Sequence, residues 1–230
     1  MENILIVAAH PDDEVLGCGG VIAKHINNGD KVHILILAEG ITSRDKSRNQ
    51  NEREDVLLKL KDSARKAHEI LGSNSLKLLD LPDNRMDSLE LLDIVKLVES
   101  EISFIKPDII YTHHVGDLNI DHQITNQAVF TACRPQPNSK LKKIYTFEVP
   151  SSTEWQTPDK GQIFTPNTFI NISNTLSKKI EALKAYDTEM KPWPHSRSIE
   201  SVKHLAAWRG ASVGFEAAEA FMLIRELKDR

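Results

Sequence analysis

The chain has 230 residues, of which 40% are hydrophobic and 27% charged, and its 29 basic and 33 acidic side chains give a formal net charge of −4. This composition is typical of one soluble domain spanning residues 1–230, large enough to fold without disulfides. The charge provides no general basic surface, which excludes a charge-driven nucleic-acid binder. No apolar run reaches the ~18 residues of a membrane span. Cys18 and Cys133 are expected to be reduced thiols of a cytoplasmic protein.

Strands and helices are predicted to alternate along the first half of the chain. Continuous apolar runs predict strands at residues 3–9, 31–38, 76–79 and 108–112. Helices are predicted from the end of the first strand to about Asn28, then at 52–71 and 88–105. The charged stretch 39–51 and the segment 81–85 are predicted to be loops.

The second half is less regular. Strands are predicted at 141–149 and 168–172, joined by a loop at 150–167, and helices from 174 or 177 to 190 and from about 198 to 208. A final element is expected at 217–227. Because the strands are continuous apolar runs that alternate with helices, we predict an α/β fold: a Rossmann-like, doubly wound, mainly parallel sheet with helices on both faces.

One histidine and three acids are crowded directly after the first strand, in the stretch Ala9-His10-Pro11-Asp12-Asp13-Glu14. Crowded carboxylates repel one another, and a cation would relieve the repulsion. Zinc and related ions take histidine nitrogen and aspartate oxygen, with one site left open for water when the role is catalytic. We therefore expect a metal hydrolase in which His10 and Asp13 bind the ion and Asp12 acts on the water. A helix-capping aspartate would explain one of the acids, not the whole cluster.

A second dense cluster follows the strand at 108–112. It contains His113, His114, Asp117, Asp121 and His122. In doubly wound folds, ligands bind beyond the carboxyl ends of the strands, so the two clusters are expected to meet. His122 is expected to begin the next helix, which would fix the direction of its ring. Asp121 is expected to orient either His10 or His122 by hydrogen bonding, with Asp117 in a similar supporting role.

Both clusters match a known family. His-Pro-Asp-Asp-Glu after the first strand and Gly-Asp-Leu-Asn-Ile-Asp-His after a later one resemble the zinc-dependent PIG-L/LmbE-like deacetylases, which remove N-acetyl groups from amino sugars and sugar conjugates. The resemblance implies that His10, Asp13 and His122 bind Zn²⁺, or another divalent ion such as Fe²⁺, and that Asp12 is the general base. Zinc lowers the pKa of its water to about 7. Asp12 would take a proton as the water attacks and pass it to the leaving amine, so that acetate and a free amino sugar are released.

The chain departs from the family pattern at Asn119, where many members carry a histidine. An amide can donate a hydrogen bond to an oxyanion but cannot deliver a proton. Either His113 or His114 substitutes for the missing histidine, or Asp12 acts as both acid and base. We favour Asp12 in both roles, with Asn119 as a polar donor.

The resemblance also implies substrate contacts. An arginine from the segment after the second strand is expected near the sugar; Arg44, Arg48 and Arg53 are in range, and Arg53, at the start of the long helix, is preferred. Further candidates for the substrate wall are Glu14, Glu148, Trp155, Tyr186 and Arg209. The implied partner is a small acetylated amino-sugar compound. Several members form trimers or hexamers, which leaves a homo-oligomer open.

Two alternatives remain at this point. The first is a metal amidohydrolase that acts on a non-sugar amide with the same chemistry. The second is a metal-free Rossmann-like protein that binds a nucleotide or S-adenosylmethionine at Leu16-Gly17-Cys18-Gly19-Gly20, with Glu39 on the ribose. Acids ahead of the glycines would repel a phosphate, and this alternative leaves the cluster at 113–122 unexplained. Glycines that pack the first helix tightly on the sheet are the better interpretation.

Overall fold

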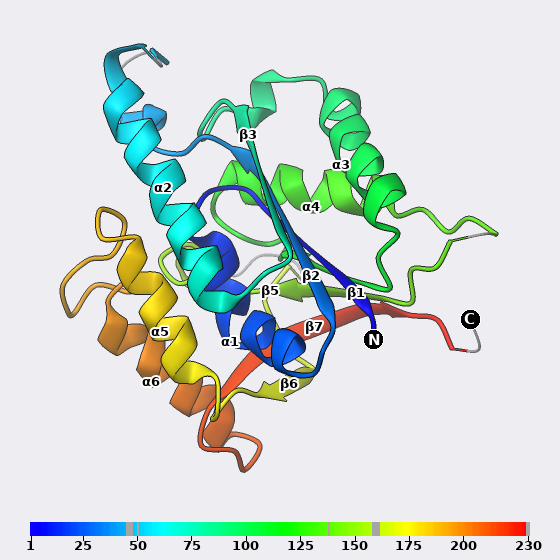
Figure 1. Cartoon of the computed structure of the whole chain (residues 1–230), viewed down its shortest axis with the longest axis vertical. Coiled ribbons are helices and arrows are strands. Elements are labelled where there is room, and N and C mark those ends of the chain that lie inside the picture. The colour runs from blue at the N-terminus through cyan, green and yellow to red at the C-terminus, as the bar shows by residue number, and fades with distance from the viewer. Residues whose placement is uncertain (45–47, 50, 138, 158–161, 229–230) are drawn as a thin grey trace.

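A computed structural model of the chain describes residues 1–44, 48–49, 51–137, 139–157 and 162–228. The described strands form one sheet in the order β3-β2-β1-β4-β5-β7-β6 (Figure 1). These strands are β1 (Asn3–Ala8), β2 (Lys31–Ala38), β3 (Ser75–Leu81), β4 (Ile109–His113), β5 (Lys143–Phe147), β6 (Thr168–Asn171) and β7 (Ala218–Glu226).

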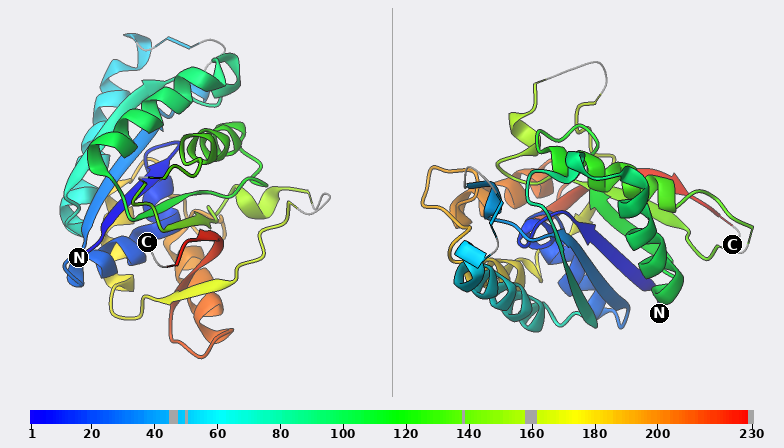
Figure 2. Two further views of the ribbon diagram at one scale, coloured as in Figure 1. Left: turned by 90° about the vertical axis from the view of Figure 1, so that its right-hand side faces the viewer. Right: turned by 90° about the horizontal axis from the view of Figure 1, so that it is seen from above.

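Helices follow most of the strands. They are α1 (Asp13–Asn27), α2 (Glu54–Leu71), α3 (Leu91–Ile105), α4 (Ile120–Ala132), α5 (Leu176–Ala185) and α6 (Ile199–Ala211). Short 3₁₀ turns are η1 (Thr42–Arg44), η2 (Asn51–Arg53), η3 (Met86–Ser88) and η4 (Thr153–Trp155). The view from above in Figure 2 shows helices on both sides of the twisted sheet.

The predicted α/β fold is confirmed. β1 pairs in parallel with β2 on one side and β4 on the other, and β3 and β5 extend the parallel sheet outward. The final element, left undefined by the sequence, is the strand β7, which lies antiparallel between β5 and β6. The sheet is therefore mixed at one end. Parallel pairing still places the carboxyl ends of β1 and β4 side by side, which is where both clusters begin.

The central strand β1 divides its side chains between two cores. Ile4 and Ile6 belong to the core beneath α1, α2, α5 and α6, whereas Leu5 and Val7 belong to the core beneath α3 and α4. All four of these side chains are fully buried. Successive side chains of a strand point to opposite faces, so a strand covered on both faces must be apolar throughout. This is why β1 has no polar alternation in its sequence.

The glycines after the first cluster lie inside α1, not in a loop. A Cβ at Gly17 would meet the Phe147 ring at 2.4 Å, and one at Gly20 would meet Ile172 at 2.8 Å. Glu39 is also engaged, because its carboxylate accepts hydrogen bonds from Thr42 and Arg48. The glycines therefore allow α1 to approach the sheet closely and offer no loop for a phosphate.

Replacing Gly17 by alanine is expected to destabilise the fold by about 1–3 kcal/mol, the usual cost of overpacking a core. The added methyl group has no room, because the Phe147 ring that it meets is itself fully buried. Chemical denaturation measures the change in the free energy of unfolding. A second substitution, Phe147→Leu, should recover part of the loss by making room. Equal stability of Gly17→Ala and the parent would show that α1 does not depend on this contact.

Several boundaries differ from the predictions. The helix predicted to reach Met190 ends at Ala185, and the turns after it carry Glu189 and Arg197 toward the carboxyl end of the sheet. The charged stretch 39–51, predicted as a loop, contains η1 and the start of η2, while residues 45–47 and 50 of it lie outside the described residues, as do 158–161 of the loop predicted at 150–167.

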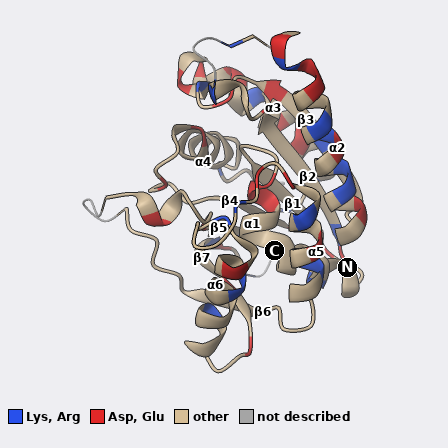
Figure 3. Cartoon of the chain, turned by 90° about the vertical axis from the view of Figure 1, so that its left-hand side faces the viewer, with Lys and Arg blue, Asp and Glu red and all other residues tan. Residues whose placement is uncertain are grey.

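Charge is interspersed along the outer helices. Figure 3 shows basic and acidic residues mixed along α2. Among the described residues, no helix is both long and apolar enough to cross a membrane.

Candidate functional site

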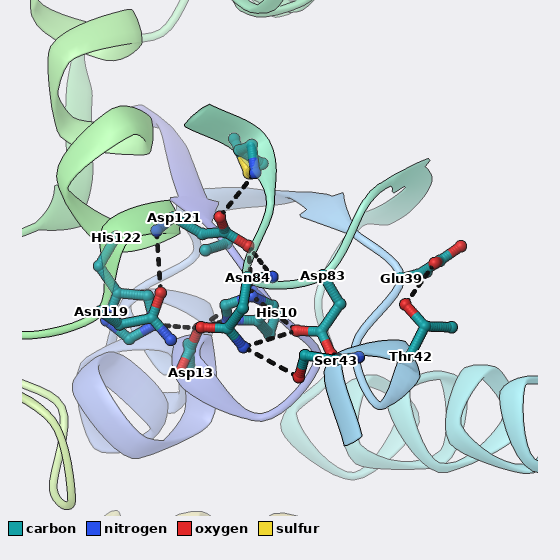
Figure 4. Close-up of polar contacts among 12 residues, drawn as sticks. His10, Asp13, Glu39, Thr42, Ser43, Asp83, Asn84, Asn119, Asp121 and His122 are labelled. Carbon is teal, nitrogen blue, oxygen red and sulfur yellow. Dashed lines mark hydrogen bonds and ion pairs between the residues drawn. The ribbon is translucent and has the colours of Figure 1, made fainter. Parts of the chain in front are cut away.

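Three segments meet beyond the carboxyl ends of the parallel strands β1, β3 and β4 (Figure 4). The turn after β1 carries His10 to Asp13, the turn after β3 carries Asp83, and the segment after β4 leads into α4, which carries Asp121 and His122. The residues that the sequence placed in two clusters therefore come together. Asp83 joins them from a segment that was predicted only as a loop.

The turn between β1 and α1 is held by its own polar groups. The backbone N–H of His10 donates to Asp13 Oδ2 at 3.0 Å, and the N–H of Asp12 donates to Glu14 Oε2 at 3.0 Å. Asp12 has a φ of 110°, a conformation that costs energy for a non-glycine residue. Its side chain forms no cap hydrogen bond with α1, so helix capping does not account for it. The carboxylate of Asp12 is therefore not used to cap α1.

His10, Asp13 and His122 bring three potential ligand atoms together. Asp13 Oδ2 lies 3.2 Å from His10 Nδ1 and 3.0 Å from His122 Nε2, and the three atoms all lie within 4.8 Å of one another. Within the described part of the chain, Asp13 Oδ1 is buried without a hydrogen-bond partner, and both ring nitrogens of His122 lie near carboxylates but form no hydrogen bond of good geometry. Buried polar atoms normally have partners. Two imidazoles and a carboxylate with unsatisfied atoms suit a borderline divalent cation such as zinc.

Each histidine has a carboxylate on its other ring nitrogen. His10 Nε2 lies 2.9 Å from Asp121 Oδ2 and 3.2 Å from Asp83 Oδ1, while His122 Nδ1 lies 3.1 Å from Asp117 Oδ1. The hydrogen bond to Asp121 fixes the direction of the His10 ring, and the Asp117 carboxylate lies beside the His122 ring. Of the two histidines that Asp121 was expected to orient, His10 is the one that it contacts.

Those carboxylates are held in turn by their surroundings. Asp121 accepts hydrogen bonds from the backbone N–H groups of Asn84, at 2.6 Å, and Met86, at 2.9 Å. Asp117 accepts from the hydroxyls of Ser152 and Thr153. His10, Asp83 and Asp121 could also hold an ion between them. Because both oxygens of Asp121 are already occupied, the group formed by His10, Asp13 and His122 is the better candidate.

The site favours positive charge. Burial lowers the pKa of His122, but Asp13 and Asp117 raise it more strongly, to about 9. Burial also lowers the pKa of His10, yet hydrogen bonds with Asp121 and Asp13 raise it well above its ordinary value. Burial raises the pKa of Asp117, but the charge of His122 and the hydrogen bonds that it accepts lower it to about 2. The carboxylates thus stabilise a cation in this space.

Asp12 stands beside this group and pairs with Arg197. Its Oδ2 lies 2.9 Å from Arg197 Nη1. Burial raises the pKa of Asp12 well above its ordinary value, although the charge of Arg197 opposes this. Sequence reasoning missed Arg197, which lies far along the chain in the turns before α6. No periodicity or motif in the sequence marks it.

A polar cavity of about 140 Å³ opens onto these residues. Its lining includes His10, Asp12, Asp83, Asn119, Arg44, Glu189 and Arg197. The cavity places the imidazole of His10, the carboxylate of Asp12 and the guanidinium groups of Arg44 and Arg197 around a single space. It is large enough for a small polar group.

The structure places the remaining predicted residues in different surroundings. Asn119 lines the cavity, while its side-chain oxygen accepts a hydrogen bond from the N–H of Asp121 at the start of α4. His114 is buried, and its Nε2 lies 2.8 Å from the carbonyl oxygen of Gln162. Among the described residues that line the cavity, Arg44 is present, whereas His114 and Arg53 are not.

The other substrate-wall candidates lie apart from the cavity lining. Glu14 and Tyr186 are fully buried. The Tyr186 hydroxyl donates a hydrogen bond to Glu14 Oε1 at 2.6 Å. Glu148 forms a two-point ion pair with Arg209 and lines neighbouring hollows of the surface. Trp155 is 51% exposed. Their contact with substrate stays a prediction.

Comparison with known proteins agrees with this geometry. The family model PIG-L, described as GlcNAc-PI de-N-acetylase, matches residues 5–133, a range that contains both clusters. The chain is 29% identical over 191 residues to the uncharacterized deacetylase YaiS of Escherichia coli, covering 80% of this chain and 90% of that protein.

A second curated relative and one solved structure extend the comparison. A 4-oxalmesaconate hydratase of Pseudomonas putida is 25% identical over 233 residues, covering 92% of this chain and 83% of that protein. The N,N'-diacetylchitobiose deacetylase of Pyrococcus horikoshii has the same fold, with a TM-score of 0.77, 18% identity, and coverage of 97% of this chain and 84% of that chain. The relatives therefore include both deacetylases and a hydratase.

Proposed function

The chain belongs to the PIG-L family, and we propose that it is a metal-dependent hydrolase that removes an N-acetyl group from an amino sugar or sugar conjugate. The observation that carries this proposal is the group formed by His10, Asp13 and His122, of which His10 lines one cavity together with the carboxylate of Asp12. The relatives include a probable N-acetyl-alpha-D-glucosaminyl L-malate deacetylase of Bacillus cereus, 24% identical over 189 residues.

We assign the metal to His10 Nδ1, Asp13 and His122 Nε2. A neutral His10 whose Nε2–H donates to Asp121 presents the lone pair of Nδ1 toward Asp13, and the Asp117 carboxylate lies 3.1 Å from Nδ1 of His122. The nitrogen and oxygen ligand set suits Zn²⁺, with Fe²⁺ as an alternative. When bound, such an ion polarises a carbonyl group and makes water more acidic.

Asp12 moves the proton. Its carboxylate takes a proton from the attacking water and delivers it to the nitrogen of the leaving amine. Burial, which raises its pKa, suits it to hold that proton between the two steps. Asp12 lines the cavity, whereas His113 and His114 are not among the described residues that do, which favours Asp12 as both base and acid.

The other residues of the cavity bind and orient the substrate. The side-chain amide of Asn119 can donate to the acetyl oxygen. Arg44, which lines the cavity, is better placed to contact a sugar than Arg53. Glu14 and Tyr186 support the site from beneath, because Glu14 accepts from the N–H of Asp12 and from the Tyr186 hydroxyl.

Removing the carboxylate that contacts the second ring nitrogen of either histidine is expected to weaken metal binding by about 10- to 100-fold, because that ring is then less well oriented. Asp121→Asn tests His10, and Asp117→Asn tests His122. Competition with a chromogenic chelator measures the affinity for zinc. Asp62→Asn, on the exposed face of α2, is the control and should bind zinc as the parent does. Parent-like affinity in both site variants would contradict the assignment of the ligands.

A second candidate function is hydration of an unsaturated acid, which the relationship to the hydratase favours. A third is hydrolysis of a non-sugar amide, which would use the same residues. To discriminate, the zinc-loaded protein is incubated with N-acetylglucosamine conjugates, with simple N-acetylated amines and with 4-oxalmesaconate. Acetate and free amine are then measured, together with loss of the unsaturated acid.

The proposal predicts acetate and free amine in equal amounts from an acetylated sugar, at a rate well above that of the simple amides. Water addition to the unsaturated acid without acetate release from any amide would establish the hydratase instead. Comparable rates on sugar and non-sugar amides would establish a general amidohydrolase.

A further inference from the structure

We propose that Arg197 is the counter-ion of the reaction. Its guanidinium pairs with the Asp12 carboxylate before proton transfer and with the oxyanion of the tetrahedral intermediate after it. The inference rests on the proposed deacetylase function and adds a residue to it. The positive charge comes from the turns that follow α5, outside the two clusters that carry the other reacting groups.

The guanidinium of Arg197 is held in place before any substrate arrives. Nη1 donates to Asp12 Oδ2 at 2.9 Å, and Nε donates to Ser151 Oγ at 2.7 Å. Its backbone N–H donates to His195 Nδ1, and its carbonyl oxygen accepts from Lys191 N–H. The side chain is only 22% exposed. A donor fixed in this way stabilises developing charge without having to reorganise during the reaction.

The same guanidinium retains a free donor. Within the described part of the chain, Arg197 Nη2 forms no hydrogen bond, and Arg197 lines the cavity together with His10 and Asp12. Because the five N–H groups of a guanidinium lie in one plane, Arg197 can hold Asp12 with one group and an oxyanion with another.

The other donors of the cavity fit this role less well. Asn119 is neutral, and its side-chain oxygen is already committed to the start of α4. Arg44 pairs with Glu189 at 2.7 Å, and its side chain is 51% exposed, so water screens its electrostatic interactions. Arg197 lies farther from Glu189, at 3.8 Å, and much closer to Asp12. Arg197 is therefore the less exposed of the two arginines and the one that contacts the group that takes the proton.

The charges balance through the step. The water forms a bond from its oxygen to the acetyl carbon, its proton goes to Asp12, and the electron pair of the C=O π bond moves to the carbonyl oxygen. Asp12 becomes neutral as the oxyanion becomes negative, so the negative charge moves across the cavity while Arg197 remains its counter-ion. When the C–N bond breaks, its electron pair goes to nitrogen, which takes the proton from Asp12. The C=O bond re-forms and Asp12 is again an anion beside Arg197.

The test uses the zinc-loaded protein, the variant Arg197→Met and methylphosphonate as a tetrahedral anion that resembles the hydrated acetyl group. Arg197→Met should bind methylphosphonate about 10- to 100-fold more weakly than the parent, the cost of one charge-assisted hydrogen bond. Its kcat for acetate release should fall by about 10²- to 10³-fold, while KM changes by only a few-fold and zinc content stays at the parent value.

Two controls sharpen the experiment. Arg65→Met removes an exposed guanidinium on α2 and should match the parent in every measurement. Adding guanidinium ion to Arg197→Ala should restore part of the lost kcat, which a purely structural role of Arg197 would not allow. Methylphosphonate affinity equal to the parent in Arg197→Met, or a kcat that is unchanged or higher, would overturn the inference.

The outcomes also separate the two proposals. A parent that releases no acetate but loses methylphosphonate affinity on Arg197→Met would refute the deacetylase function and leave the charge role of Arg197 standing. A parent that releases acetate, with an Arg197→Met variant indistinguishable from it, would leave the function standing and refute the role of Arg197.

Discussion

Asp12→Asn is expected to lower kcat for acetate release by about 10²- to 10⁴-fold, the usual contribution of a positioned general acid or base. Asparagine keeps the size and shape of the side chain but cannot accept the proton. Because Asp12 is not among the three residues assigned to the metal, zinc content should remain near the parent value. Steady-state kinetics and metal analysis of the same preparation measure both quantities.

Asp87→Asn is the matched control for this prediction. Asp87 is exposed in η3, outside the cavity lining, and its loss should leave turnover unchanged. Near-normal turnover of Asp12→Asn would show that another group moves the proton. A loss of zinc together with the loss of activity would show instead that Asp12 belongs to the ligand set.

His122→Ala is expected to lose both metal and activity. His122 is fully buried and lies 3.0 Å from Asp13 on one side and 3.1 Å from Asp117 on the other, so its loss removes one of the three assigned ligand atoms. Removing a residue that only orients a metal ligand weakens metal binding by up to about 100-fold. Removing the ligand itself should therefore lower the affinity for zinc by more than this. Equilibrium dialysis against buffered zinc measures the loss.

Folding must be separated from ligation in this test. His122→Gln keeps most of the side-chain volume without the imidazole, and circular dichroism verifies that both variants retain the fold. His204→Ala, at an exposed position of α6, is the control and should bind zinc as the parent does. Zinc bound by a folded His122→Gln as tightly as by the parent would rule out His122 as a ligand.

Much of this architecture could be predicted because it depends on local pattern. The apolar runs of β1, β2 and β4 identify strands buried on both faces, and parallel pairing of such strands brings their carboxyl ends together. That single consequence of topology places His10 and Asp13 beside His122. Two of the three proposed ligands follow a strand within a few residues, so sequence position alone indicates where they lie.

The rest of the site depends on contacts between distant segments. Arg197 reaches Asp12 from the turns before α6, and Asp83 reaches His10 from the turn after β3. Neither turn has a periodic pattern that indicates what it covers. Glu14 differs in the other direction. Its place in the first cluster suggested contact with substrate, but its carboxylate accepts a hydrogen bond from the buried Tyr186 hydroxyl. Sequence spacing gives no information on such partners.

Metal content tests the central claim most directly. Purified parent protein and Asp13→Ala are dialysed against the same buffer containing trace zinc and analysed for bound metal per chain. Asp13 contacts both histidines, so its loss should remove the ion. About one divalent ion is expected per parent chain, and essentially none in the variant. A parent that stays metal-free after exposure to zinc, or a variant that retains the ion, would contradict it.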